Sequence, residues 1–229
     1  MSSLTVIVPS LNEEKNIENT FNRINNVVPK YFDDFEVLLF NDGSTDSTSN
    51  IIEKIKEQNK DKVKTIHHSF PCGLGYVYKK GLEIATKDYV IMIPGDDQML
   101  EQAMINIFEC KAKADMVIPY TSNQWVRPLL RRVVSTIYTT LLNILFGYKI
   151  RYYNGTVLHK REIIQSIKIT TDSFFYQAEA LIKLLGHGKT FIEVGVPIKE
   201  REGGKTKAFS LKNIYNVIKD IIKLKFSLL

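Results

Sequence analysis

Residues 89–98 read Tyr-Val-Ile-Met-Ile-Pro-Gly-Asp-Asp-Gln, an apolar run that ends abruptly in a turn and two carboxylates. The apolar run predicts a buried strand, and its Pro-Gly dipeptide predicts the turn that closes it. Open α/β folds bind ligands at the carboxyl ends of their strands, where Asp96, Asp97 and Gln98 would offer the oxygen ligands that divalent cations prefer. The alternative is a plain turn followed by a helix N-cap, a position that favours Asp.

The first half of the chain alternates strand and helix patterns. Runs rich in β-branched residues are followed by segments whose apolar residues recur at helical spacing. The predicted strands are residues 4–8, 35–40, 63–67 and 89–93, with a helix after each of the first three. Strands separated by helices indicate right-handed βαβ units. The sequence therefore predicts an α/β fold with a mostly parallel central sheet flanked by helices.

Polar loops follow these four strands. They contain Glu13, Asp42, the glycine pair of residues 73–75, and Asp96, in strand order. Because the carboxyl ends of parallel strands share one edge, we expect these loops to converge on one ligand-binding crevice. A chance surplus of acidic loop residues is the alternative.

The second half of the chain has a different pattern. We predict strands at 115–119, 157–159 and 190–199, and a helix over 174–185. The closing segment, 211–229, has an amphipathic helical pattern. We expect one domain over residues 1–210, and a C-terminal helix over 211–229 that packs on the domain, on a partner or on the membrane. Its predicted apolar face is Ile214, Tyr215, Ile218, Ile221 and Ile222.

Composition limits the possible partners. The chain has 229 residues, 44% of them hydrophobic, which is enough for a full core. Its net charge of +6 favours an anionic partner such as a nucleotide, a lipid phosphate or a membrane surface. We expect no nucleic acid, because basic and aromatic residues are not interleaved. Two cysteines without disulfide or metal-ligand spacing predict reduced thiols in a cytoplasmic protein.

Two segments bear on the membrane. The N-terminus lacks a charged leader and a cleavage site, which predicts no signal peptide. The longest apolar stretch, 133–146, spans about 14 residues and contains five polar ones, whereas a bilayer span needs about 20. We therefore expect a chain that does not cross the membrane. Basic residues before this stretch favour an interfacial helix on the membrane surface.

Three motifs carry a family resemblance. They are Val8-Pro-Ser-Leu-Asn-Glu13, Asn41-Asp-Gly-Ser-Thr-Asp46 and Gly73-Leu-Gly75, followed by the acidic end of residues 89–98. In this order and spacing the chain resembles family-2 glycosyltransferases of the GT-A (Rossmann-like) fold. Among them it is similar to the dolichyl- or polyprenyl-phosphate mannose or glucose synthases, to about residue 210.

The resemblance implies a nucleoside diphosphate sugar as donor. The first two loops would hold the nucleoside through Pro9, Leu11, Glu13, Phe40 and Asp42. Carboxylates suit this role because they accept hydrogen bonds from base N–H groups and ribose hydroxyls. The alternative is that these polar residues only cap a helix or form a turn.

The resemblance also implies a divalent cation, Mg²⁺ or Mn²⁺, at the diphosphate. Its ligands would be Asp96 and Gln98, beside Gly95, but Pro94 stands where the family has its first metal-binding Asp. Asp97 either compensates for this loss or caps a helix.

A basic loop, Arg201-Glu-Gly-Gly-Lys-Thr-Lys207, matches the family pattern that covers the donor phosphates. The resemblance makes Arg201 and Lys207 phosphate-binding residues that act in catalysis with Asp96.

The acceptor side shows a second departure. Phe174 and Phe175 stand where family members that use hydroxyl acceptors carry an acidic residue that acts as the catalytic base. A phosphate monoester needs no base, since its second pKa is about 6. Arg131 and Ser135 match a lipid-phosphate-binding segment. Arg127 or Arg132 would replace a family arginine that is missing near Thr121; we assign Arg127, Arg131 and Ser135 to the acceptor.

We therefore expect an inverting transferase that moves a sugar to a polyprenyl phosphate, peripheral on the cytosolic membrane face. Two alternatives remain open: transfer to a saccharide hydroxyl with Asp172 as base, and a nucleotide-binding homologue that has lost catalysis. A homo-oligomer or a separate membrane subunit is compatible with each of them.

Overall fold

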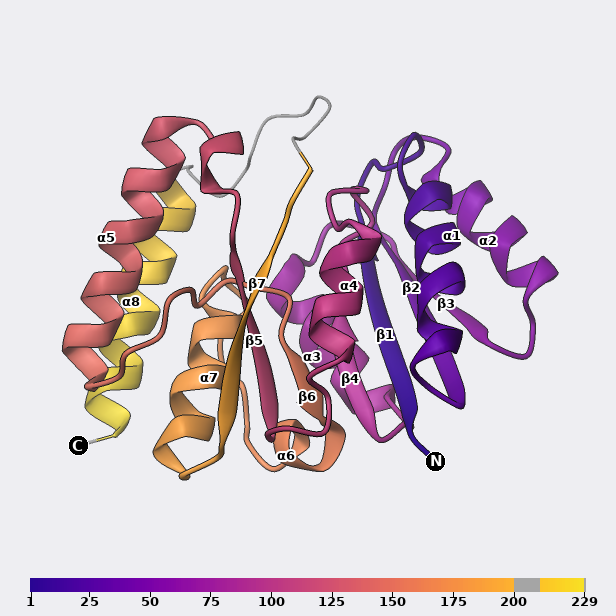
Figure 1. Cartoon of the computed structure of the whole chain (residues 1–229). Helices are drawn as coiled ribbons and strands as arrows, with labels where there is room; N and C mark the ends of the chain where they lie inside the picture. Colours follow the sequence, from indigo (N-terminus) through magenta and orange to yellow (C-terminus); the bar gives the residue numbers. More distant parts are fainter. Residues whose placement is uncertain (200–210, 229) are drawn as a thin grey trace.

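A seven-stranded sheet runs through the molecule, with helices on both faces, in the computed structural model (Figure 1). The structure describes residues 1–199 and 211–228. The strands are β1 (Ser3–Ser10), β2 (Asp34–Asp42), β3 (Val63–His68), β4 (Tyr89–Met92), β5 (Met116–Thr121), β6 (Leu158–Lys160) and β7 (Phe191–Val196). The helices are α1 (Ile17–Val27), α2 (Thr48–Gln58), α3 (Leu74–Ile84), α4 (Glu101–Phe108), α5 (Leu129–Phe146), α6 (Arg161–Gln165), α7 (Tyr176–Gly186) and α8 (Leu211–Ser227). Two 3₁₀ turns, η1 (Val28–Lys30) and η2 (Gln124–Val126), complete the described chain.

The strand order is β3-β2-β1-β4-β6-β5-β7. The first four of these strands are mutually parallel, β6 is antiparallel to both of its neighbours, and β5 and β7 are parallel. Because two reversals cancel, β5 and β7 point the same way as β4. The carboxyl ends of all strands except β6 therefore share one edge, and the predicted mostly parallel α/β sheet is confirmed.

Two hydrophobic cores lie on opposite faces of the sheet. Side chains alternate along a strand, so in β1 the Ile7 side chain enters one core while Val6 and Val8 enter the other. Helices α1, α2 and α4 cover the face of Val6 and Val8, and α3, α6 and α7 cover the face of Ile7. This second core also receives Leu142 of α5, and Ile221 and Leu224 of α8.

Helix α5 has 18 residues and includes the whole apolar stretch 133–146. By length and composition it could cross a membrane, and only 6% of it is buried in the protein. The apolar residues Leu129 and Leu130 extend the helix ahead of the two arginines. In Figure 1, α5 and α8 lie side by side. The Lys225 ammonium of α8 donates to the Leu145 carbonyl of α5 at 2.8 Å.

Helix α8 packs on the domain through a different stripe from the predicted one. Ile221 and Leu224 are buried, whereas the other four residues of the predicted apolar face are exposed. Asp220 lies on the packed side, where it accepts hydrogen bonds from the hydroxyls of Thr171 and Ser173, the latter at 2.7 Å. Helical periodicity alone could not select the buried stripe, because α8 is apolar on more than one side.

Candidate active site

The loops after β1 and β2 are joined by side-chain hydrogen bonds. The Asn12 side-chain oxygen accepts from the Thr45 amide at 2.8 Å, and the Asn12 amide donates to the Ser44 hydroxyl at 3.0 Å. Asn12 adopts a positive φ of 59°, which Asn tolerates better than most residues. The Glu13 amide donates to the Thr48 hydroxyl at 2.9 Å. The first two sequence motifs therefore form one structural unit.

Asp42 connects the end of β2 to the glycine loop. Its carboxylate accepts from the amides of Cys72 and Gly73, each at 2.9 Å. His68 Nδ1, at the end of β3, lies 2.8 Å from Asp42 Oδ1. Asp42 is 5% exposed, and its carboxylate holds the end of β2, the end of β3 and the glycine loop together at the predicted nucleoside site. Phe40, also predicted to bind the donor, is fully buried in the core.

Two glycines allow close backbone approaches at this edge. A Cβ at Gly75 would lie 2.6 Å from the backbone carbonyl of Asp172, and a Cβ at Gly95 would lie 2.4 Å from the Ser10 hydroxyl. The Gly95 amide also donates to the Pro9 carbonyl at 3.0 Å. The glycine loop thus contacts the Asp172 segment, and the acidic turn contacts the end of β1, as the predicted convergence requires.

Asp96 and Gln98 lie together in the turn after β4. The Gln98 side-chain amide donates to Asp96 Oδ2 at 3.0 Å, and the Gln98 main-chain amide donates to Asp96 Oδ1 at 3.3 Å. The two side chains are therefore close enough to offer oxygen ligands to one cation, once the Gln98 amide turns its oxygen inward. Pro94 offers no ligand atom.

Asp97 has a structural role that the sequence did not indicate. Its carboxylate forms an ion pair with Arg23 of α1, with Arg23 Nε 3.2 Å from Asp97 Oδ1, and it lies 4.0 Å from the Lys199 ammonium. Of the two roles considered for Asp97, the helix cap is wrong, because α4 begins at Glu101 after Leu100. Asp97 has a positive φ of 56° and is nearly buried.

The predicted acceptor residues lie at the start of α5. Arg127 stacks on Tyr152, with 5.3 Å between the guanidinium carbon and the ring centre, while Arg131 and Ser135 are half-buried. Asp172, the alternative base, is exposed and pairs with Lys79 of α3 at 2.7 Å. Phe175 is buried in the core. Arg201 and Lys207 lie outside the described residues.

A cluster of mixed ligand types was missed in the sequence. Ligand atoms of Asp42, His68 and Cys72 lie within 4.8 Å of one another and could hold a metal ion. Sequence spacing gave no sign of it, because Asp42 lies 26 residues before His68, at the end of a different strand. Burial, together with the nearby Asp42 carboxylate, raises the pKa of the Cys72 thiol. Cys72 and Cys110 are both free thiols, as predicted.

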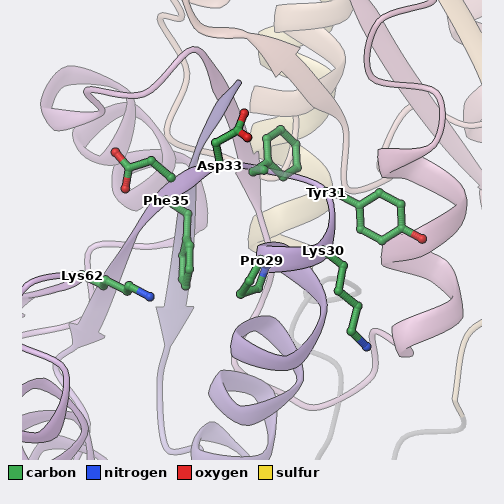
Figure 2. A pocket seen from close by; sticks show the side chains of 8 residues that line it. Pro29, Lys30, Tyr31, Asp33, Phe35 and Lys62 are labelled. Atoms are coloured by element: carbon green, nitrogen blue, oxygen red, sulfur yellow. The ribbon is translucent and has the colours of Figure 1, made fainter. Parts of the chain in front are cut away.

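Two cavities lie at opposite edges of the sheet. The smaller, about 280 Å³, lies at the amino ends of β2 and β3, where Figure 2 shows Phe35 and Lys62 on one wall. The larger, about 610 Å³, lies at the carboxyl end of β5 and is lined by Thr121, Trp125 and Arg151, among others. Only the larger one shares an edge with Asp42 and Asp96.

The chain has the GT-A fold, as its similarity to solved structures shows. Glucosyl-3-phosphoglycerate synthase from Mycobacterium tuberculosis, solved with Mg²⁺ and UDP, superposes with a TM-score of 0.69 at 17% identity, covering 99% of this chain and 79% of that one. The same enzyme with Mn²⁺, UDP-glucose and phosphoglyceric acid gives a TM-score of 0.67 at 18% identity, with the same coverage. The predicted GT-A fold is confirmed.

Residues 5–167 match the sequence model of glycosyl transferase family 2, and the chain belongs to this family of glycosyltransferases. Polyprenol monophosphomannose synthase from Mycolicibacterium smegmatis is 24% identical over 214 residues, which cover 88% of this chain and 79% of the relative. Poly-beta-1,6-N-acetyl-D-glucosamine synthase from Staphylococcus aureus is 28% identical over 148 residues, 62% of this chain. This chain spans only 34% of that second relative. The family resemblance is confirmed.

Proposed function

We propose that this glycosyltransferase moves a sugar from a nucleoside diphosphate sugar to a polyprenyl phosphate, with inversion at the anomeric carbon. The observation that carries the proposal is the similarity to a polyprenol monophosphomannose synthase along 88% of this chain and 79% of that relative. The acceptor side supports it, since arginines stand there and phenylalanines replace the expected basic carboxylate.

The donor nucleoside would lie on the joined loops after β1 and β2. Glu13 and Asp42 would accept hydrogen bonds from the base or ribose, with Pro9 and Leu11 beside them. The network around Asn12 and Asp42 holds these loops before any ligand arrives, which limits the entropy lost on binding. The solved structure of similar fold that holds UDP supports a nucleotide donor.

Asp96 and Gln98 would hold Mg²⁺ or Mn²⁺ at the donor diphosphate. Their adjacent side chains fit an ion that retains water and shares ligands with a substrate, which is how Mg²⁺ is usually bound. When bound, the ion supplies positive charge to the leaving diphosphate. Arg201 and Lys207 would add to that charge.

The transfer itself needs no protein base. An oxygen of the acceptor phosphate attacks the anomeric carbon from the face opposite the diphosphate and forms the new carbon–oxygen bond. The old bond to the diphosphate oxygen breaks, and its electron pair leaves with the nucleoside diphosphate. Because the acceptor oxygen is already anionic near neutral pH, the residues of this chain position it and stabilise charge. Arg127, Arg131 and Ser135 are the proposed positioning groups.

The surface formed by α5 and α8 would place the enzyme on the cytosolic face of a membrane. Its exposed apolar residues include Val133, Ile137 and Ile144 of α5, and Ile218 and Ile222 of α8. Basic residues precede this surface at the start of α5, where anionic headgroups would attract them. A second copy or a membrane subunit could cover the same surface.

A second candidate function is transfer to a saccharide hydroxyl. It is favoured by the position of Asp172, an exposed carboxylate whose backbone packs against Gly75 of the glycine loop. In this reaction Asp172 would accept the hydroxyl proton as the new bond forms. Asp172→Asn should then abolish transfer to a soluble glycan, whereas transfer to a lipid phosphate should survive the same change.

The decisive experiment is a panel of nucleotide sugars incubated with Mn²⁺ and a short polyprenyl phosphate, with products identified by mass. We expect one glycosyl prenyl phosphate, and its loss in Asp96→Ala with little change in the unfolding transition. A fully active Asp96→Ala enzyme would contradict the assignment of this residue to the cation. Donor binding without any product would favour an inactive homologue.

A further inference from the structure

The larger cavity combines two arginines with the single tryptophan of the chain. It has a volume of about 610 Å³ and opens at the carboxyl end of β5, beside Tyr120 and Thr121. Arg132 comes from the first turn of α5, and Arg151 comes from the segment between α5 and β6. Two arginines in the lining of one cavity favour an anionic ligand.

Arg151 is held in place by the fold. Its amide donates to Glu193 Oε1 at 2.7 Å, and its guanidinium carbon lies 4.5 Å from the centre of the Tyr120 ring. The Asn143 side chain pairs with both main-chain groups of Ile150, the preceding residue, at 2.9 and 3.1 Å. Arg151 Nε also forms a long ion pair with Glu193 Oε2, at 3.8 Å. The side chain is still 62% exposed, so it is positioned yet available to a ligand.

The cavity is connected to the acidic turn by hydrogen bonds from the Asn123 side chain and from the Lys199 amide. Asn123, next to the cavity residue Gln124, exchanges two hydrogen bonds with Ile198 at 2.9 and 3.0 Å. The amide of Lys199, the next residue, donates to the Gln98 carbonyl at 3.2 Å. The segment of Ile198 and Lys199 therefore joins the turn of the proposed cation ligands to the segment that lines the cavity.

We propose that Arg151 and Arg132 of this cavity, in addition to Arg127, Arg131 and Ser135, bind the phosphate monoester that is the reacting group of the acceptor. The inference rests on the proposed function and assigns a binding role to Arg151, which the sequence did not indicate. The planar fork of each guanidinium suits bidentate phosphate binding, and the Tyr120 ring fixes the orientation of one fork. The phosphate could belong to a lipid headgroup or to a soluble ester, because both present the same dianion.

Trp125 provides a direct measurement, because it is the only tryptophan and lines the cavity. Its fluorescence would be titrated with a short prenyl phosphate and, separately, with glycerol 3-phosphate. The variants are Arg151→Ala, Arg132→Ala and Arg151→Lys. The matched control is Lys149→Ala, which removes the same charge from the same exposed segment but does not line the cavity.

We expect both probes to change the fluorescence of the wild type, and Arg151→Ala to weaken binding by roughly tenfold or more. Arg132→Ala should also weaken binding, Arg151→Lys should restore part of it, and Lys149→Ala should stay within about twofold of the wild type. Tighter binding of the prenyl phosphate would identify a lipid source, and equal binding a soluble one. No response to either probe, or equal effects of Arg151→Ala and Lys149→Ala, would overturn the inference.

Donor binding separates this inference from the proposed function. A set of nucleoside diphosphates that includes UDP, each titrated calorimetrically with Mn²⁺, reports the donor site without involving the cavity. If UDP binds and the arginine variants behave like the control, only the cavity assignment fails. If no nucleoside diphosphate binds while the phosphate probes do, the proposed transfer fails and the anion site stands.

Discussion

Asp97→Asn tests whether the second carboxylate of the acidic turn belongs to the structure or to the cation. The change keeps the shape of the side chain but removes the charge that pairs with Arg23 at 3.2 Å. Removing one partner of a fully buried pair costs about 3–5 kcal/mol, and exposed pairs are worth about 0–1 kcal/mol. Arg23 is 25% exposed and Asp97 9%, so the loss should lie between these limits. We expect about 1–3 kcal/mol, with the positive φ tolerated by Asn.

The assay pairs urea denaturation with UDP binding in the presence of Mn²⁺. Asp97→Asn should lower the urea midpoint and leave UDP affinity nearly unchanged at a temperature where the protein is folded. Asp96→Asn, the same substitution one residue earlier, should lose UDP affinity with a smaller loss of stability. If Asp97→Asn keeps full stability but loses Mn²⁺-dependent UDP binding, Asp97 is a cation ligand and the reasoning from the Arg23 pair is refuted.

Two further changes test the packing and the charge of the fold. Gly75→Ala would place a Cβ 2.6 Å from the Asp172 backbone, so overpacking of about 1–3 kcal/mol should lower the thermal midpoint by about 2–12 °C. Gly186→Ala, whose nearest contact would be 3.5 Å away, should not lower it, and equal midpoints would contradict the clash. The Lys160 ammonium, with Thr190, lowers the pKa of Asp115 from 3.8 to about 2. The stabilisation is therefore present above pH 4 and lost as the pH falls toward 2. Asp115→Asn should make the urea midpoint depend less on pH between about pH 4 and 2. If the pH dependence is the same as in the wild type, Asp115 does not contribute to it.

Local patterns were sufficient to predict the acidic edge. Residues 89–98 form a buried strand and a polar turn from their own sequence, and the family motifs placed Glu13 and Asp42 at the same edge. The α/β class and the parallel core followed from the alternation of such segments. These features depend on neighbours in the chain, which a single sequence displays.

These local patterns could not predict contacts between residues far apart in the sequence. Arg151 is positioned by Glu193, 42 residues away, and nothing in its own segment indicates this contact. His68 and Cys72 approach Asp42 only because β2 and β3 are neighbours in the sheet. The ion pair between Asp97 and Arg23 joins residues separated by 74 positions. In each case the topology of the fold decides which residue is the partner. The role of the side chain could therefore not be predicted from the sequence.

The hydrogen bonds of Asp220 have a practical consequence for anyone shortening this protein. Asp220 holds Thr171 and Ser173, and the residue between them packs its backbone against Gly75. A version that stops at residue 210 would lose the anchor of this segment and uncover the core surface now under Ile221 and Leu224. Helix α8 therefore belongs in any fragment prepared for donor-binding or crystallisation work, even though it carries part of the exposed apolar surface.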